Sequence, residues 1–265
     1  MNGIVSLENV LDQLRSKGLH LPVVFPDGLN KEPVELNVVS VQDLLSGDKL
    51  EDLIARAARR MNSGNLAAAA SLFQKRYASA LLASVLNPLL RENIGILADS
   101  EQTEIVLEDD LPAGIRLKDP SKWVWLESGS PLITQVFEAV FDDNLGQLIY
   151  RIASEFGLSP MIMWGNVGNY IGYVHEQFSK DPSQGDFTKE IFDRLLKGSG
   201  FNAPPFCSTY QTVLLEEAEP AQWVRVRSTC CLWYQFPGNQ NKPCSTCPRL
   251  SGKERTKLLA KSKKA

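Results

Sequence analysis

The sequence predicts a predominantly helical α+β fold with a small antiparallel sheet and a C-terminal four-cysteine segment. Apolar residues recur at helical spacing through most of the 265 residues, whereas short alternating runs typical of strands gather between residues 94 and 126. Four of the five cysteines lie within residues 230–247. This length allows one large domain or one domain with a small appendage.

The first 60 residues predict an N-terminal helical and extended region. A helix is expected over residues 7–17, where Gly18 supplies the stop signal. The next 20 residues are rich in proline and are expected to be extended. Ser40, followed three residues later by Asp43, resembles a capping box that begins a short helix, and residues 50–61 predict another amphipathic helix.

Residues 61–220 predict a helical body that contains the small sheet. The stretch 62–90 is apolar nearly all round, and its only charged residues are Lys75 and Arg76. A helix of this kind is expected to be buried. Strands are expected over residues 104–107, 113–117 and 123–126, and further helices over about 131–155, 159–178 and 186–197.

Residues 221–265 predict a C-terminal segment that ends in a basic tail. Polar and apolar residues alternate from Trp223 to Phe236, which predicts a strand. Residues 251–262 predict a short basic helix. The four clustered cysteines lie between the beginning of this strand and the helix.

The charge of the chain is uneven. There are 28 Lys and Arg residues against 31 Asp and Glu residues, a formal net charge of −3. Residues 249–265 hold seven basic residues and one acid, a net +6, which leaves −9 for the rest of the chain. An acidic body does not suit a nucleic-acid-binding protein, so no nucleic-acid partner is expected. The basic tail is either solvated or in weak contact with an anionic membrane surface.

The sequence predicts a cytoplasmic protein. Glu8 and Asp12 stand where a signal peptide would need a basic start and then an apolar run. Residues 156–175 form an uncharged stretch of 20 residues, nominally long enough to span a bilayer. Its proline, glycines and asparagines instead indicate a helix packed closely inside a protein.

The four clustered cysteines are Cys230, Cys231, Cys244 and Cys247. In a reducing compartment such a set is more typical of a metal or cluster site than of disulfides. The C-x2-C pair suits either zinc or iron. The other two cysteines are adjacent, so on an extended segment their side chains point to opposite sides, and a single tetrahedral zinc site would be strained. An iron–sulfur cluster is larger and accepts ligands from different directions, which favours iron.

Two motifs resemble the C-terminal signature of the FhuF-like ferric-siderophore reductases: Arg227-Ser228-Thr229-Cys230-Cys231 with Tyr234, and Cys244-Ser245-Thr246-Cys247-Pro248. In that family two adjacent cysteines, about ten further residues and a C-x2-C pair carry a [2Fe-2S] cluster. Here twelve residues separate the two cysteine pairs, two more than in the family pattern. The stretches 71–90 and 161–178 are similar to the helical body of the family, which is related to the C-terminal part of siderophore synthetases.

The resemblance implies a ferric-siderophore reductase, in which a [2Fe-2S] cluster on Cys230, Cys231, Cys244 and Cys247 passes one electron to an intracellular ferric siderophore and ferrous iron is released. The siderophore is expected to be of the hydroxamate or citrate-hydroxamate type. Such hard oxygen donors hold ferric iron better than ferrous iron, so reduction also releases the iron. No flavin or nucleotide signature is recognisable, which favours an external electron donor such as a ferredoxin or a similar redox protein. In this interpretation residues 61–220 bind the siderophore and residues 221–265 hold the cluster.

Six further residues are candidates for contact with the siderophore: Lys75, Arg76, Arg225, Arg227, Trp233 and Tyr234. The two charges on the apolar helix either meet carboxylate or hydroxamate oxygens or face solvent or an internal acid. The two arginines that alternate on the expected strand point either to the cluster and its ligand or to solvent. The two aromatic residues either shield the cluster, contact the ligand or belong to the core.

Other motifs fail on context. Residues 198–203 match a dinucleotide-binding G-x-G-x-x-A pattern, but they follow a helix and lead into prolines. His175 and Glu176 begin a zincin motif that Ser179 does not complete. Cys207, the fifth cysteine, is expected to be a small buried hydrophobe. Two other functions stay open: a zinc-stabilised, non-catalytic siderophore- or partner-binding protein, and a biosynthetic relative that binds siderophore precursors.

Overall fold

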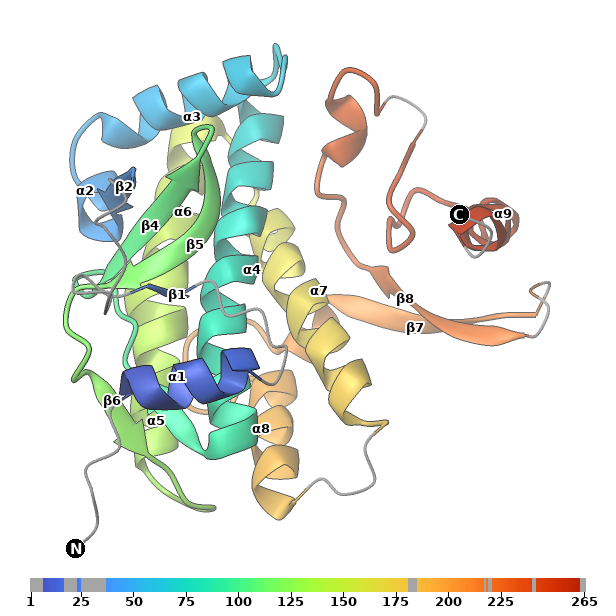
Figure 1. The fold of residues 1–265 in the computed structure, drawn as a ribbon. Helices are drawn as coiled ribbons and strands as arrows, with labels where there is room; N and C mark the ends of the chain where they lie inside the picture. The colour runs from blue at the N-terminus through green and yellow to red at the C-terminus, as the bar shows by residue number, and fades with distance from the viewer. Residues whose placement is uncertain are drawn as a thin grey trace, which may run out of the picture.

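The computed structural model describes residues 7–16, 23–24, 37–180, 185–216, 218, 221–239 and 242–262. Figure 1 shows a helical body with small sheets on one side, and a hairpin and the C-terminal end of the chain projecting on the other side. Helices dominate and the strands form small, mostly antiparallel sheets, so the predicted fold class is confirmed.

The helices are α1 (Leu7–Ser16), α2 (Val41–Leu45), α3 (Lys49–Arg60), α4 (Leu66–Glu92), α5 (Leu132–Phe137), the π-helix η1 (Glu138–Gly146), α6 (Gln147–Phe156), α7 (Pro160–Phe178), α8 (Asp186–Lys197), the 3-10 helices η2 (Phe206–Ser208) and η3 (Trp233–Gln235), and α9 (Gly252–Ser262). The strands are β1 (Val23–Val24), β2 (Val38–Ser40), β3 (Ile94–Ile96), β4 (Thr103–Glu108), β5 (Leu111–Leu117), β6 (Trp123–Trp125), β7 (Tyr210–Leu215) and β8 (Gln222–Arg227).

Helix α4 runs through the centre of the body (Figure 1). Asn65 caps its N-terminus, since the Asn65 side chain accepts a hydrogen bond from Ala68 N at 3.0 Å. The helix ends at Asn93, which adopts the left-handed conformation with φ of 56°. Phe73 and Tyr77 have no exposed surface. The buried helix that the apolar sequence predicts is therefore confirmed.

Helices α5, η1 and α6 follow one another without a break, where the sequence predicts one helix. The π-helical middle part was not predicted. It contains the buried Asn144, which accepts a hydrogen bond from Tyr77 Oη at 2.7 Å and donates to Ala98 O at 2.8 Å and to Thr103 Oγ1 at 3.2 Å. A polar group buried in the core needs such partners, and these partners lie on segments far away in the sequence.

The strands of the body form two sheets. One has the order β1-β5-β4-β2, with β1 parallel to β5 and the other pairs antiparallel. Strand β6 pairs instead with β3, where Ile94 lies opposite Trp125 and Ile96 opposite Trp123. The three strands predicted between residues 104 and 126 are confirmed. The partners β1, β2 and β3 were not predicted, because each is only two or three residues long and pairs with a strand distant in the sequence.

Helix α7 carries the surface on which the β7–β8 hairpin packs. Gly165, Gly168 and Gly172 lie along one face, and side chains of the hairpin and its flanking residues approach so closely that a Cβ at any of the three positions would collide with them. The close packing expected for residues 156–175 is confirmed. Within the described parts of the chain, no helix combines the length and apolarity needed to cross a membrane.

The strand predicted from Trp223 to Phe236 is shorter than expected, because β8 ends at Arg227. The residues that follow, 228–262, are called the cysteine segment below. Within it the chain turns at Leu232, whose φ of 64° is left-handed. Phe236 then packs against Ala68 and Leu72 of α4. The apolar residues that extend the alternating pattern therefore pack against the body. Strand β8 pairs with β7, a strand that was not predicted.

Two smaller expectations differ from the structure or lie outside it. Ser40 is the N-cap of α2, as predicted, but its side chain makes no capping hydrogen bond. Gly198 ends α8 in the left-handed conformation, so residues 198–203 are a helix end and not a phosphate-binding loop. Of the proline-rich stretch after Gly18, the structure describes only β1 and residues 37–38, the second of which begins β2.

Candidate functional site

The four cysteines of the cysteine segment come together as two pairs. Cys230 Sγ lies 3.9 Å from Cys247 Sγ, and the thiol of Cys244 is hydrogen-bonded to Cys231. Cys231 and Cys247 are buried, whereas the other member of each pair is half-buried. Cys230 and Cys231, although adjacent in sequence, therefore contact different partners. The sequence predicts that their side chains point in different directions.

Hydrogen bonds from two arginines join the loops that carry these pairs. The Arg227 backbone N–H donates to Thr246 O at 2.9 Å, which ties the end of β8 to the C-x2-C turn. Arg255, on α9, is 3% exposed. Its guanidinium donates to the backbone oxygens of Ser245, of Cys247 at 2.9 Å and of Leu250 at 3.1 Å. The basic helix therefore has a buried side that holds the cysteine turn.

The Arg227 side chain is the charged group in direct contact with the sulfurs. It is 2% exposed, and its Nη2 lies 3.0 Å from both Cys231 Sγ and Cys244 Sγ. Its Nη1 donates to Asn166 Oδ1 at 3.0 Å. A buried cation needs a nearby negative charge, since an unpaired charge in the interior is costly. Arg227 thus favours a negative charge on this cysteine pair.

A chain of buried polar groups connects Arg227 to α4 and α7. Asn166 Nδ2 donates to Gln74 Oε1 at 3.1 Å and to Ser71 O at 3.3 Å. The Ser71 hydroxyl donates in turn to Cys231 O at 3.2 Å. The body therefore positions both the arginine and the backbone of one cysteine.

The charges around the Cys231–Cys244 pair favour a thiolate. The hydrogen bond that the Cys244 thiol donates, with the charges of Arg227 and Lys75, lowers the pKa of Cys231 to about 4, although burial opposes this shift. The same hydrogen bond, together with burial, raises the pKa of Cys244 well above its ordinary value. At neutral pH the pair holds a negative charge, and the thiolate is the form of cysteine that binds metals.

The donor arrangement fits a cluster with two iron atoms better than a single ion. A structural zinc site needs four donors around one ion. Among the described residues, no three His, Cys, Asp or Glu side chains converge on a point that could hold one ion. A [2Fe-2S] cluster takes two ligands on each iron, which matches two pairs of thiols. Arg227 Nε and Gln74 Nε2 are buried without a hydrogen-bond partner in the described chain, and both are suitable donors to sulfur.

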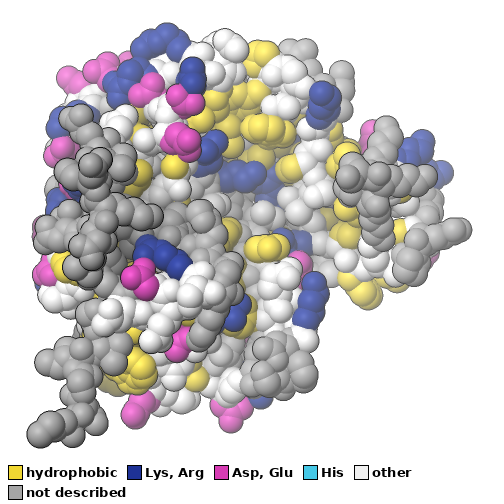
Figure 2. All heavy atoms as spheres, viewed as in Figure 1, with side chains coloured by type: hydrophobic (Ala, Val, Ile, Leu, Met, Phe, Trp, Pro, Cys, Tyr) yellow, Lys and Arg dark blue, Asp and Glu magenta, His cyan; other side chains and the backbone are white. Residues whose placement is uncertain are grey.

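The structure separates the two charges that the sequence singles out on α4. Lys75 is half-buried and close enough to Cys231 to lower its pKa. Arg76 points elsewhere, and its Nε donates to Pro112 O of β5 at 3.1 Å. Figure 2 shows Lys and Arg side chains gathered between the helical body and the C-terminal end of the chain. Lys75 is thus at the cysteine site and Arg76 is with the sheet.

The two arginines of β8 are both buried, so the alternative that they are surface cations is wrong. Arg225 is 8% exposed, and its Nη1 lies 2.5 Å from Glu176 Oε1 of α7. Its Nε donates to Asn169 Oδ1 at 3.3 Å, and its guanidinium lies 5.7 Å from the centre of the Tyr210 ring. Arg225 therefore faces α7, and Arg227 faces the sulfurs.

The aromatic candidates are half-buried beside the cysteines. The ring centres of Trp233 and Phe236 are 5.7 Å apart, next to the contact with α4. The guanidinium of Arg249 lies 4.0 Å from the centre of the Tyr234 ring. Both aromatic residues thus have partners within the cysteine segment, and their contact with a ligand stays a prediction.

The expectation for Cys207 is wrong, because its side chain is exposed. It lies in the 3-10 helix η2, where the neighbouring Phe206 takes the inward position and is fully buried. A single turn cannot bury both neighbours, and the larger apolar side chain gains more from burial.

Four residues of the site were not found from the sequence. Ser71, Gln74 and Asn166 are buried polar residues within apolar helices, and this contrast with their neighbours was an available signal. Arg255 is hidden among the basic residues of the tail. Its burial depends on the fold of the cysteine turn, so no local pattern distinguishes it from its solvated neighbours.

Two family models match the chain. A model described as "Ferric iron reductase FhuF-like transporter" matches residues 71–217, which is more than half of the chain. A model described as "FhuF 2Fe-2S C-terminal domain" matches residues 227–249, which include all four clustered cysteines and Arg227. No individually curated protein matches the sequence.

Two solved structures of an aerobactin synthetase share the fold. The aerobactin synthetase IucA from a hypervirulent pathotype of Klebsiella pneumoniae matches with a TM-score of 0.55 and 12% identity, over 66% of this chain and 35% of the synthetase. The ATP-bound form of that synthetase matches with a TM-score of 0.52 and 13% identity, over 68% of this chain and 34% of the synthetase. The chain thus spans about a third of the length of these synthetases, and the likeness concerns the fold.

Proposed function

The chain belongs to the FhuF-like ferric iron reductase family and has its C-terminal [2Fe-2S] domain, and we propose that it reduces an intracellular ferric siderophore by one electron. The proposed ligands of the cluster are Cys230, Cys231, Cys244 and Cys247. The proposed substrate is of the hydroxamate or citrate-hydroxamate type. The proposed products are ferrous iron and the free siderophore, and the proposed location is the cytoplasm.

The observation that carries this proposal is the arrangement of two thiol pairs around the buried Arg227. When bound, a [2Fe-2S] cluster accepts one electron and can pass it on. Each added electron adds a negative charge, and Arg227, fixed by Asn166, stabilises that charge at the sulfurs of Cys231 and Cys244. Hydrogen bonds to sulfur and local charge are the means by which a protein adjusts the potential of such a centre.

One-electron reduction is a suitable way to release siderophore iron. Hydroxamate and carboxylate oxygens are hard donors, and they hold the less charged ferrous ion less tightly than the ferric ion. The electron must come from a separate donor, for which we propose a ferredoxin or a similar one-electron redox protein. The balance of the reaction is then one electron in and one ferrous ion out for each ferric complex.

Spectroscopy and a single-turnover assay test the proposal. Anaerobically purified protein is expected to contain equal iron and sulfide, and to lose visible absorbance and gain an S = 1/2 EPR signal when dithionite is added. The reduced protein, freed from dithionite, is then mixed with a ferric trihydroxamate complex and a ferrous-specific chelator. One ferrous ion for each oxidised cluster is expected. A colourless protein that holds one zinc after anaerobic cluster reconstitution, or a reduced cluster that no ferric siderophore reoxidises, would overturn it.

A further inference from the structure

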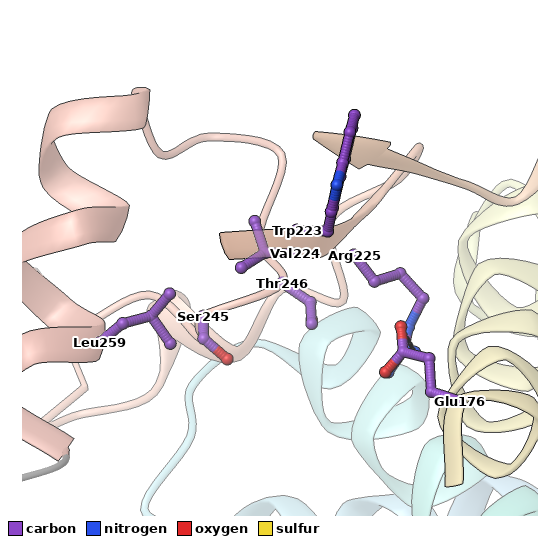
Figure 3. A pocket seen from close by; sticks show the side chains of 7 residues that line it. All are labelled: Glu176, Trp223, Val224, Arg225, Ser245, Thr246 and Leu259. Carbon is purple, nitrogen blue, oxygen red and sulfur yellow. Dashed lines mark ion pairs between the residues drawn. The ribbon is translucent and has the colours of Figure 1, made fainter. Parts of the chain in front are cut away.

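A hollow of about 190 Å³ lies beside the turn that carries Cys244 and Cys247. Figure 3 shows that its walls come from four parts of the chain. The lining includes Trp223 and Arg225 of β8, Ser245 and Thr246 of the cysteine turn, Glu176 of α7 and Leu259 of α9. Among these, Arg225 was a candidate from the sequence and Trp223 was not.

The hollow combines an apolar wall with polar groups of no net charge. Trp223 of β8 and Leu259 of α9 form the apolar wall. Trp223 is 67% exposed, which is unusual for so large an apolar side chain. Among the lining residues that the structure describes, the one cation, Arg225, is 2.5 Å from the one acid, Glu176. The Ser245 side chain is exposed and lines the hollow, so its hydroxyl is accessible to a ligand.

Strand β8 leads from this hollow to the sulfurs. Alternate residues of a strand share a face, and on this face the exposed fraction falls from 67% at Trp223 to 8% at Arg225 and 2% at Arg227. Thr246 lines the hollow, and its hydroxyl lies 3.9 Å from Cys244 Sγ. A molecule in the hollow is therefore separated from a proposed cluster ligand by one side chain. Electron transfer through protein slows steeply with distance, so this is a favourable place for an electron acceptor.

We propose that this hollow docks the ferric siderophore and takes one arm of an uncharged ferric trihydroxamate complex. The inference rests on the function proposed above and specifies its substrate site. Pockets that enclose a whole small molecule have volumes of about 300–1,000 Å³, so a hollow of about 190 Å³ holds a part of such a complex. Trp223 packs against the methylene chain of the arm, and the Ser245 hydroxyl donates a hydrogen bond to a hydroxamate oxygen.

The charge of the hollow decides which class of complex it takes. Glu176 already neutralises Arg225, and burying a highly anionic complex without a free cation is costly. The hollow therefore favours a neutral trihydroxamate over a triscatecholate complex, which carries a charge of about −3. Lys75, which lies near Cys231, is not part of this lining.

The test measures binding with a gallium(III) trihydroxamate complex of zero net charge, which has the shape of the ferric complex but accepts no electron. The holoprotein is titrated by calorimetry. Trp223→Ala is expected to raise Kd by about tenfold, and Ser245→Ala by about threefold. The matched control is Trp125→Ala, because Trp125 is also exposed, at 57%, and lines a different hollow beside Ser128 and Pro131. It is expected to leave Kd unchanged.

Three outcomes would overturn the proposed site. These are an unchanged Kd in Trp223→Ala, an equal loss of affinity in Trp125→Ala, and equally tight binding of a gallium triscatecholate. The visible spectrum of each variant confirms that the cluster is intact. If the wild-type protein reduces the ferric complex while Trp223→Ala binds the gallium complex normally, the site lies elsewhere and the reductase function stands. If the wild-type protein neither binds nor reduces trihydroxamates, both proposals fail.

Discussion

The helical body and the cysteine segment are stabilised in different ways. In the body, apolar side chains from nearly every helix and strand form one continuous buried cluster. In the described part of the cysteine segment the buried residues are Cys231, Phe236, Cys247 and Arg255. Phe236 packs against α4 in a small separate cluster. The segment therefore depends on hydrogen bonds from arginines and on its thiols, where the body depends on the hydrophobic effect.

The two regions also differ in net charge. Residues 221–265 contain ten basic residues and one acid, a net +9, which leaves −12 for residues 1–220 of a chain with −3 in total. Thiolate ligands and added electrons are negative, so positive charge in this region lowers the cost of holding them. The comparison indicates a body that folds without the cofactor and a segment whose order depends on it.

The strongest test of this difference removes a cysteine. Cys231→Ser is expected to abolish the visible absorbance and the EPR signal of the cluster, because serine oxygen replaces a soft thiolate. Trypsin is then expected to cleave after Arg249 or Lys253, since the segment has lost its main support. The far-UV circular dichroism of the body and its main thermal transition are expected to stay close to those of the wild type.

The matched control for this test is Cys207→Ser. Cys207 is exposed and lies outside the cysteine segment, so this variant is expected to keep the full cluster signal and resistance to trypsin. A Cys231→Ser protein with an intact [2Fe-2S] spectrum, or a body that unfolds together with the segment, would contradict the comparison.

A second test neutralises the buried cation. Arg227→Gln is expected to lower the reduction potential, because the reduced centre carries one more negative charge than the oxidised centre and loses the stabilising guanidinium. A charge-assisted hydrogen bond contributes about 1.5–3 kcal/mol, which corresponds to a decrease of roughly 60–130 mV for one electron. An anaerobic redox titration followed by visible absorbance measures this change.

Arg227→Lys is the control for charge as distinct from geometry. Lysine keeps the positive charge but cannot reach two sulfurs and Asn166 at once, so a smaller decrease is expected. An unchanged potential in Arg227→Gln would show that Arg227 is only a structural link.

A third test disturbs the contact between α7 and the hairpin. Gly168→Ala places a Cβ against the Thr209 side chain. Overpacking destabilises the fold by about 1–3 kcal/mol, and the higher helix propensity of alanine stabilises it by at most about 1 kcal/mol. A decrease of about 1 kcal/mol in the free energy of unfolding, measured with urea, is therefore expected. In Gly64→Ala, the control, no atom lies within 4 Å of the new Cβ, and stability is expected to be unchanged. Greater stability in Gly168→Ala would refute this close contact.

The smallest effect is expected from the two neighbouring charges on α4. Lys75→Gln should lower the potential by roughly 10–40 mV, since a partly exposed charge contributes about 0.2–1 kcal/mol. Salt should reduce the difference from the wild type, because exposed charges are screened. Arg76→Gln, whose arginine contacts Pro112 on the sheet, should leave the potential unchanged. Equal shifts in the two variants would mean that Lys75 has no special position.

The sequence alone determined the helical character of the body and which four cysteines form the candidate cluster site. Residues 62–90 predict a buried helix because apolar periodicity is a local property that survives in the fold. The adjacent pair Cys230 and Cys231, with the C-x2-C pair after it, indicates a cluster because ligand type and spacing follow from the chemistry of the metal. These features need no knowledge of distant contacts.

Only the tertiary structure decided which groups surround the cysteines. Arg225 and Arg227 are equivalent in the alternating sequence, yet one meets Glu176 and the other meets two sulfurs. Ser71 reaches Cys231 across 160 residues of sequence. Lys75 and its neighbour on α4 turn to different sides of the molecule. Contacts of this kind depend on how helices and loops pack in space, and local propensity and periodicity carry no information about that packing.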